Sequence, residues 1–161
     1  MTKSMQRPRA LIASSVGAAA LVAVAAMAFA QTNAAQTIGA RQDAMKAQGA
    51  AMKTLTQMVR GEAAWDQEAA LKAASALSDS SKAIPIVFPQ GTGTEAGKTN
   101  ALPVIWQQWA DFQDKAKALT TASEKLAQLA RANDVDGVKA QFPNVGKACG
   151  GCHETYRAKS N

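Results

Sequence analysis

Apolar residues recur with helical spacing along most of this chain. From Thr32 to Arg60 no proline occurs, and an apolar stripe returns every seven positions, at Ile38, Met45, Met52 and Val59. A neighbouring position of the repeat is apolar at Leu55 but polar one and two repeats earlier, at Gln48 and Arg41. Such a narrow stripe is typical of a helix in a bundle. The pattern predicts one helix of roughly 40 Å, at about 1.5 Å per residue, which ends at Gly61.

Two more helices are predicted on either side of a long linker. An alanine-rich stretch from Trp65 or Asp66 to Lys82 forms the second helix, with Asp66 as its N-cap and Pro85 beyond its end. The third helix opens at Leu102-Pro103, where proline suits the first turn, and runs to about Ala132. Its apolar positions again lie seven apart, at Ile105, Phe112, Leu119 and Leu126.

The last predicted helix begins at Asn133 or Asp134 and reaches about Lys159. Pro143 lies inside it and cannot donate a backbone hydrogen bond, so we expect it to kink or divide this helix. Residues 83–100 contain two prolines and three glycines and are predicted to form a loop. Loops of this length in compact domains tend to cover a functional site or to act as linkers. The apolar residues at 84 and 86–88 predict that the first half of this loop is packed.

The composition agrees with helices rather than strands. Alanine favours helix, strands prefer β-branched and aromatic residues, and aromatic residues make up only 5% of the chain. Four amphipathic helices therefore predict an all-α fold, an antiparallel four-helix bundle, which occupies residues 31–161 as a single domain.

Residues 1–30 have the features of a secretory signal peptide. Lys3, Arg7 and Arg9 precede an uncharged apolar stretch that ends in Ala28-Phe29-Ala30. A retained membrane anchor is the alternative, because about 20 apolar residues can span a bilayer. The stretch is weakly hydrophobic and ends in a good cleavage site, so we expect removal after Ala30, or near Ala34 or Ala35. The mature protein would then be periplasmic, with no membrane attachment.

The net charge changes once this leader is set aside. The full chain carries +6, whereas the remaining 15 basic and 12 acidic residues give +3. These charges are scattered along the predicted helices without a basic cluster or interleaved aromatic residues. The sequence therefore does not predict nucleic-acid binding.

Both cysteines and the sole histidine of the chain lie within five residues, in Cys149-Gly150-Gly151-Cys152-His153. This C-x-x-C-H sequence is the attachment motif of c-type haem. Two thiols three residues apart on a helix can each add to a haem vinyl group, and the adjacent His153 can then ligate the iron. One motif predicts one covalently bound haem c per chain.

Three other readings of the motif fit less well. A thioredoxin-like pair normally accompanies a βαβ unit, which this sequence lacks. A structural zinc site uses four ligands, whereas the chain has only three cysteine and histidine side chains. A disulfide can form after export but leaves the adjacent histidine unexplained.

Together these residues make the chain resemble the class II cytochromes c, the high-spin cytochromes c′ and their low-spin relatives. The most specific match is Cys149 to His153 followed by Tyr156-Arg157. Three further segments agree: Arg41-Gln42, Phe88-Pro89-Gln90-Gly91-Thr92 and Pro103-Val104-Ile105-Trp106. The resemblance implies an antiparallel four-helix bundle with haem near one end, often dimeric through its first two helices.

The resemblance also implies roles for single residues. Arg41, with Gln42, matches a pair that contacts a haem propionate, although an isolated arginine here would otherwise be taken for a surface residue. Thr99 is a weaker candidate for the second propionate. Arg157, one turn after His153, is expected to shield the proximal face of the haem. We expect Tyr156 and Trp106 to be packing residues.

Met45 matches the family position over the distal haem face. Several low-spin members place a methionine there, followed four residues later by glycine, as Gly49 follows here. A methionine thioether is a good ligand for haem iron, but methionine on a helix stripe is also a common core residue. With Met45 as sixth ligand the protein would be a low-spin electron carrier that meets redox partner proteins. Without it, the protein would be a high-spin cytochrome c′ that binds or scavenges nitric oxide or carbon monoxide. We do not expect an enzyme, because no second histidine is present for acid–base catalysis.

Overall fold

The computed structural model of this chain describes residues 16–159, with side chains from residue 33 onward. Residues 1–15 of the predicted leader, and the side chains of its remainder, lie outside the described part, so the leader stays a prediction. The described residues form five helices and no strand apart from one isolated bridge. The fold is thus all-α, as expected.

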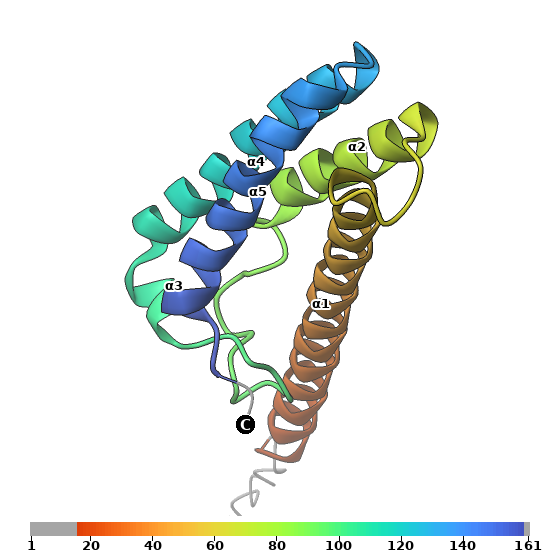
Figure 1. Cartoon of the computed structure of the whole chain (residues 1–161). Coiled ribbons are helices and arrows are strands. Elements are labelled where there is room, and N and C mark those ends of the chain that lie inside the picture. Colours follow the sequence, from red (N-terminus) through yellow and green to blue (C-terminus); the bar gives the residue numbers. More distant parts are fainter. Residues whose placement is uncertain (1–15, 160–161) are drawn as a thin grey trace, which may run out of the picture.

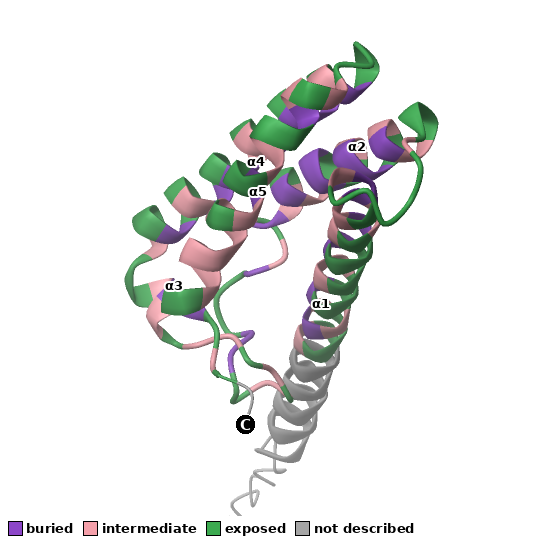
Figure 2. Ribbon diagram, in the orientation of Figure 1, coloured by how far each residue is buried: buried purple, intermediate pink, exposed green. Residues whose placement is uncertain are grey.

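Three long helices form the closely packed part of the molecule. These are α2 (Gln67–Ala83), α4 (Trp109–Arg131) and α5 (Val135–Tyr156). Helix α2 packs against α4, and α4 packs against α5. The long helix α1 (Val16–Val59) packs against α2 but makes few contacts with α5. The ribbons of α1 and α5 diverge toward one end of the bundle (Figure 1). The buried residues lie on the helix faces that point inward (Figure 2).

The predicted helix ends agree closely with the structure where a capping residue was recognised. Gly61 follows α1 with a φ of +73°, a left-handed conformation that glycine adopts without strain. Asp66 accepts a hydrogen bond from the backbone N–H of Ala69 at 3.0 Å and caps α2. Asp134 caps α5 in the same way, through the N–H of Gly137 at 2.9 Å. Pro143 lies inside α5 without dividing it.

The third and fourth predicted helices differ from the structure in two places. The third is split at Gln108 (φ −115°, ψ 44°) into a short helix α3 (Val104–Gln107) and α4. Helix α3 is held from outside, because the indole N–H of Trp106 donates to the carbonyls of Phe88 and Pro89 at 3.0 Å. The fourth ends at Tyr156 instead of Lys159, because the backbone leaves the helix to form a bridge between Arg157 and Ala101. In both places long-range hydrogen bonds override the local helix pattern.

The inward face of α1 is the largest correction. The stripe expected to be buried is only half-buried at Met45, Met52 and Val59. The neighbouring stripe is buried throughout: Arg41 is 2% exposed, Gln48 7% and Leu55 0%. The two polar residues of this stripe point into a pocket, so their polarity concealed their burial in the sequence.

The loop between α2 and α3 is ordered against the bundle. Ile84 and Phe88 are buried, as expected, whereas Ile86 is 75% exposed. Phe88 lies against Phe112 with ring centroids 5.0 Å apart, and Tyr156 meets Phe112 edge-on with centroids 5.3 Å apart. This aromatic cluster fixes the loop next to the C-terminal end of α5.

Candidate haem-binding site

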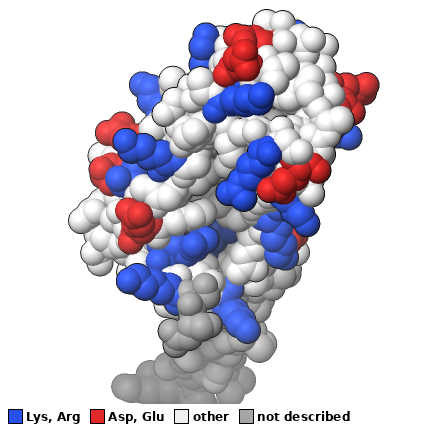
Figure 3. Space-filling model, viewed as in Figure 1, with Lys and Arg blue, Asp and Glu red and all other residues white. Residues whose placement is uncertain are grey.

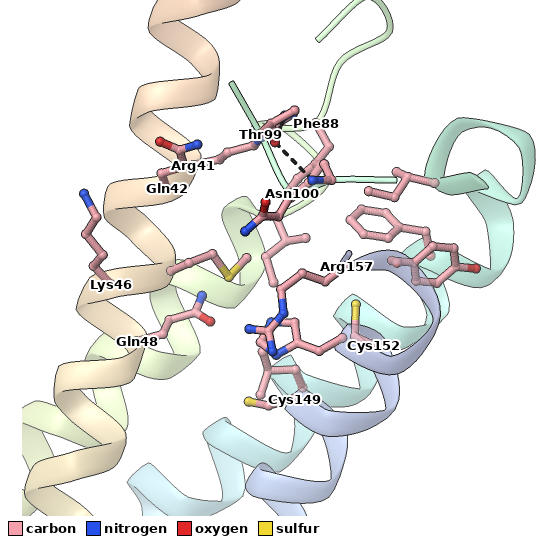
Figure 4. A pocket seen from close by; sticks show the side chains of 18 residues that line it. Arg41, Gln42, Lys46, Gln48, Phe88, Thr99, Asn100, Cys149, Cys152 and Arg157 are labelled. Atoms are coloured by element: carbon pink, nitrogen blue, oxygen red, sulfur yellow. Dashed lines mark hydrogen bonds between the residues drawn. The ribbon is translucent and has the colours of Figure 1, made fainter. Parts of the chain in front are cut away.

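A cavity of about 300 Å³ opens between α1 and α5, where the two helices make few contacts. Its walls come from both helices, from α3 and α4 and from the loop before α3 (Figure 4). Apolar side chains form much of the surface. The lining residues include no aspartate or glutamate but three basic side chains, those of Arg41, Lys46 and Arg157. All of the predicted site residues line this one cavity: Cys149, Cys152, His153, Arg41, Gln42, Met45, Thr99 and Arg157.

The motif residues Cys149, Cys152 and His153 lie near the C-terminal end of α5. Both thiols are free and half-buried, and burial raises the pKa of each. Burial and the nearby positive charge of Arg157 lower the pKa of His153. The imidazole is therefore neutral at pH 7, the form in which histidine ligates a metal.

Arg41 is an anchor between α1 and the loop, not a surface residue. Its guanidinium donates to the hydroxyl of Thr92 at 2.9 Å, to the Thr92 carbonyl at 2.6 Å and to the Thr99 hydroxyl at 2.8 Å. It also lies 4.7 Å from the centroid of the Phe88 ring, a cation–π distance. Burial lowers the pKa of Arg41, partly offset by the charge of Glu95.

Gln42 and Thr99 lie beside Arg41 at the edge of the cavity. The exposed side chain of Gln42 donates to the carbonyl of Lys98 at 2.9 Å. The hydroxyl oxygen of Thr99 accepts from Arg41 and from the backbone N–H of Ala101 at 3.1 Å. Two acceptor positions of this hydroxyl are therefore used, and its own proton is free for another acceptor.

Met45 and Gln48 line the cavity from the next turns of α1. Met45 is half-buried, and Gln48 is 7% exposed. The side-chain nitrogen of Gln48 is fully buried and has no hydrogen-bond partner in the described structure. The sequence showed that Gln48 lies on the Arg41 stripe, but nothing in it marked this amide as part of the site.

Arg157 and Tyr156 end α5 at the cavity, and their roles differ. Arg157 is exposed, and its backbone pairs with Ala101. Tyr156 is 3% exposed and donates its phenolic proton to Asp111 at 2.5 Å. Burial and this contact with the Asp111 carboxylate raise the pKa of Tyr156 to about 12. The packing role expected for Tyr156 and Trp106 agrees with these contacts, whereas the Asp111 partner was not predicted.

These side chains fit a covalently attached haem. Two free thiols and a neutral imidazole lie on one wall, an arginine with only neutral partners lies on the other, and apolar side chains lie between them. The unpartnered amide of Gln48 also indicates that the cavity is shaped for a group other than protein.

The sequence model of the family described as Cytochrome C' matches residues 36–157, which include the whole cavity lining. The chain belongs to the cytochrome c′ family. It is therefore a haem c protein, with haem bound covalently as in that family, and Cys149 and Cys152 agree with the attachment motif. Among the described residues, no helix is long and apolar enough to cross a membrane.

Similar proteins carry the names cytochrome c-556 and cytochrome c'. Cytochrome c-556 of Agrobacterium tumefaciens (strain II Chrys) is 36% identical over 119 residues, which cover 74% of this chain and 94% of that protein. Cytochrome c' of Pararhodospirillum photometricum is 38% identical over 117 residues, covering 73% and 92%. Among solved structures, the nitric oxide complex of a mutant cytochrome c prime from Alcaligenes xylosoxidans has a TM-score of 0.72 at 29% identity, covering 79% and 97%.

Proposed function

We propose that this cytochrome is a low-spin electron carrier in which His153 and Met45 are the axial ligands of the haem iron. The observation that carries the proposal is that both side chains line one cavity from facing helices, His153 on α5 and Met45 on α1. Methionine with histidine raises the reduction potential of haem and suits electron transfer. With both residues bound, the haem would transfer electrons without binding a further ligand.

The bound haem supplies the one-electron chemistry, and the chain holds and tunes it. Cys149 and Cys152 would provide the thioether links, and His153 the proximal ligand. Arg41 would bind the propionates together with Thr99, whose hydroxyl proton is free to be donated. Gln42 would contact a propionate at the edge of the cavity. Arg157 would cover the proximal side. The apolar side chains of the cavity would exclude water from the haem, so that less solvent would have to reorganise during electron transfer.

The ferric absorption spectrum tests the Met45 ligand directly. We expect a weak far-red band, the charge-transfer band of a methionine–iron bond, and we expect Met45→Leu to abolish it. Leucine has nearly the volume of methionine, so the fold should change by less than about 1.5 kcal/mol in stability.

The matched control is Met52→Leu, which changes a half-buried methionine of the same helix outside the cavity lining. This variant should keep the band. A wild-type protein that lacks the band and is high-spin would refute the proposal.

The competing function is binding of nitric oxide or carbon monoxide by a five-coordinate haem. It is favoured by the similarity to a cytochrome c prime whose structure was solved as a nitric oxide complex. In this chain, the apolar surroundings of the bound gas would come from the cavity wall formed by Ile84, Ile105 and Leu119. Carbon monoxide binding without loss of an existing ligand, followed in the ferrous spectrum, would support this second function.

We further propose that the mature chain, residues 31–161, works in the periplasm after removal of the signal peptide. Its partners would be redox proteins and a second copy of the chain, with which it would form a homodimer. On the face in Figure 3, the charged side chains nearest the lower end of the molecule are lysine or arginine. A redox partner with an acidic surface would complement this end, and its binding should weaken with salt.

A further inference from the structure

An acidic residue is joined to the wall of the haem-binding cavity through one buried side chain. Asp111, in the first turn of α4, accepts a hydrogen bond of 2.5 Å from the phenolic hydroxyl of Tyr156. Tyr156 is 3% exposed and lines the cavity, whereas Asp111 is not one of the lining residues. The carboxylate of Asp111 is thus held next to the cavity by the residue that forms part of its wall.

The same carboxylate lies close to the attachment site of the haem. Tyr156 follows Cys152 by four residues on α5, so the two side chains are neighbours on one helix face. Lys115, one turn after Asp111 on α4, lies 3.8 Å from the carboxylate. Burial raises the pKa of the Cys152 thiol, Lys115 lowers it, and the charge of Asp111 raises it. Both charges of this ion pair therefore act on the side chain that carries the haem.

Two groups limit where the Asp111 carboxylate can lie, the hydroxyl of Tyr156 and the ammonium group of Lys115. The Asp111 side chain is 55% exposed and that of Lys115 is 32% exposed, so water screens both charges in part. Oxidation of the haem iron adds one positive charge to the cavity. A negative charge held nearby favours this oxidised state, and a positive charge opposes it.

We propose that the charge of Asp111 lowers the reduction potential of the haem, and that Tyr156 is the positioning residue that holds this charge next to the cavity. Lys115 partly offsets the effect. The proposal rests on covalent attachment of haem at Cys149 and Cys152 and not on the sixth ligand of the iron. It therefore applies to an electron carrier and to a gas-binding protein alike.

The midpoint potential of the holoprotein tests the sign of each charge. Asp111→Asn removes the charge but keeps a side-chain oxygen that can accept from Tyr156, so the fold should be retained. We expect its midpoint potential to rise, with a ratio of reduced to oxidised haem about two- to tenfold higher at a fixed potential. Lys115→Gln should shift the potential in the opposite direction.

Asp136→Asn is the matched control, because it makes the same change at the other end of α5. Asp136 lies in the first turn of that helix with its side chain 99% exposed. It precedes Cys152 by sixteen residues, about 24 Å along the helix axis. This variant should have the midpoint potential of the wild type.

A double-variant cycle tests the positioning role of Tyr156. In Tyr156→Phe the carboxylate loses its buried partner and can turn toward solvent, so Asp111→Asn should shift the potential less in this background. A second measurement is the ultraviolet titration of the phenol, since Tyr156 is the only tyrosine of the chain. Burial and the Asp111 carboxylate raise the pKa of Tyr156 to about 12. This pKa should fall in Asp111→Asn, because the carboxylate charge is gone, and should stay unchanged in Asp136→Asn.

A merely structural role of Asp111 predicts the opposite shift in potential. A loosened cavity admits water, and water favours the oxidised haem. An unchanged or lower potential in Asp111→Asn would therefore overturn the proposal, as would a higher potential in Lys115→Gln. Equal shifts in the wild-type and Tyr156→Phe backgrounds, or an unchanged pKa of Tyr156 in Asp111→Asn, would show that Tyr156 does not position the charge. A shift in Asp136→Asn as large as that in Asp111→Asn would mean that any surface charge has this effect, which also contradicts the proposal.

Discussion

The buried guanidinium of Arg41 is the most informative single group in this molecule. A buried cation is costly unless it is paired and fully hydrogen-bonded. The partners of Arg41 are two hydroxyls, one carbonyl and the face of Phe88, all of them neutral. No ion pair involving Arg41 occurs among the described residues, although the charge of Glu95 is close enough to act on it. A propionate carboxylate would supply the missing opposite charge.

Replacement of Arg41 should therefore change how the reduction potential depends on pH. A cation next to a propionate lowers the pKa of that carboxyl group, so Arg41→Ala should raise this pKa toward neutrality. The propionate would then lose its proton near neutral pH, and the new negative charge would stabilise ferric haem. We expect a potential that falls as the pH rises through this range in Arg41→Ala, measured by redox titration at several pH values.

Arg131→Ala, at the exposed C-terminal end of α4, serves as the control and should match the wild type. Coinciding curves for all three proteins would mean that Arg41 only anchors the loop.

At the scale of elements, the C-terminal end of α5 is fastened on two sides. Its last carbonyl, that of Tyr156, accepts from the N–H of Leu102, and the N–H of Ala158 donates to the carbonyl of Asn100. The Tyr156 hydroxyl donates to Asp111 in the first turn of α4. Cys152 and His153 come directly before this fastening point. The rigidity of the motif thus depends on contacts that lie outside the motif.

Tyr156→Phe should loosen this fastening and lower the free energy of unfolding. A hydrogen bond to a charged group contributes about 1.5–3 kcal/mol, so we expect a loss of that order in guanidinium unfolding of the holoprotein. Burial and the Asp111 carboxylate raise the pKa of Tyr156 in the folded protein to about 12, above the ordinary tyrosine value of 10.0. The contribution is therefore complete below pH 10 and decreases as the pH rises from about 10 to 12.

The phenylalanine variant should lack this part of the pH dependence, which identifies it as a property of Tyr156 rather than of the lysines. Equal slopes in both proteins between these pH values would contradict the assignment.

At the scale of the whole molecule, the features that local chemistry specifies were predictable from the sequence. Seven-residue spacing located two of the helices, and Gly61, Asp66 and Asp134 marked helix ends because each satisfies a local backbone requirement. The site residues could also be named, since C-x-x-C-H chemistry and the family resemblance identify them. The buried face of α1 was not predictable, because Arg41 and Gln48 are buried for the site and not for their hydrophobicity.

The break at Gln108 and the early end of α5 were missed for a related physical reason. Each depends on hydrogen bonds to the distant loop, from Trp106 in one case and to Ala101 and its neighbours in the other. Such bonds leave no periodic pattern in the sequence. The loop, the part with the least regular sequence, therefore determines the details of the haem-binding end.

The arrangement of the helices makes the stability of this cytochrome depend on its haem. Helix α4 packs against both α2 and α5, whereas α1 meets α5 weakly and the cavity lies between α1 and α5. An empty cavity lowers the free energy of unfolding by about 24 cal/mol per Å³. Without haem, the cavity of about 300 Å³ would therefore cost at most about 7 kcal/mol of stability. This is a large part of the 5–15 kcal/mol that stabilises a typical domain.

Loss of covalent attachment should therefore leave a largely unfolded chain. In cells with intact haem maturation, we expect wild-type protein whose mass equals residues 31–161 plus one haem, and whose pigment resists acid-acetone extraction. The double variant Cys149→Ala, Cys152→Ala should be mostly haem-free, with circular dichroism showing reduced helix content and no cooperative melting. Serine replacement of both cysteines controls for the size of the side chain and should behave in the same way.

Because the same mass also reports the N-terminus, it tests the leader separately: a chain that begins at Met1 but carries the haem would refute cleavage while leaving the attachment intact. Extractable haem in the wild type, or a double variant as stable as the wild type, would contradict the view that the thioether-bound haem completes the core between α1 and α5.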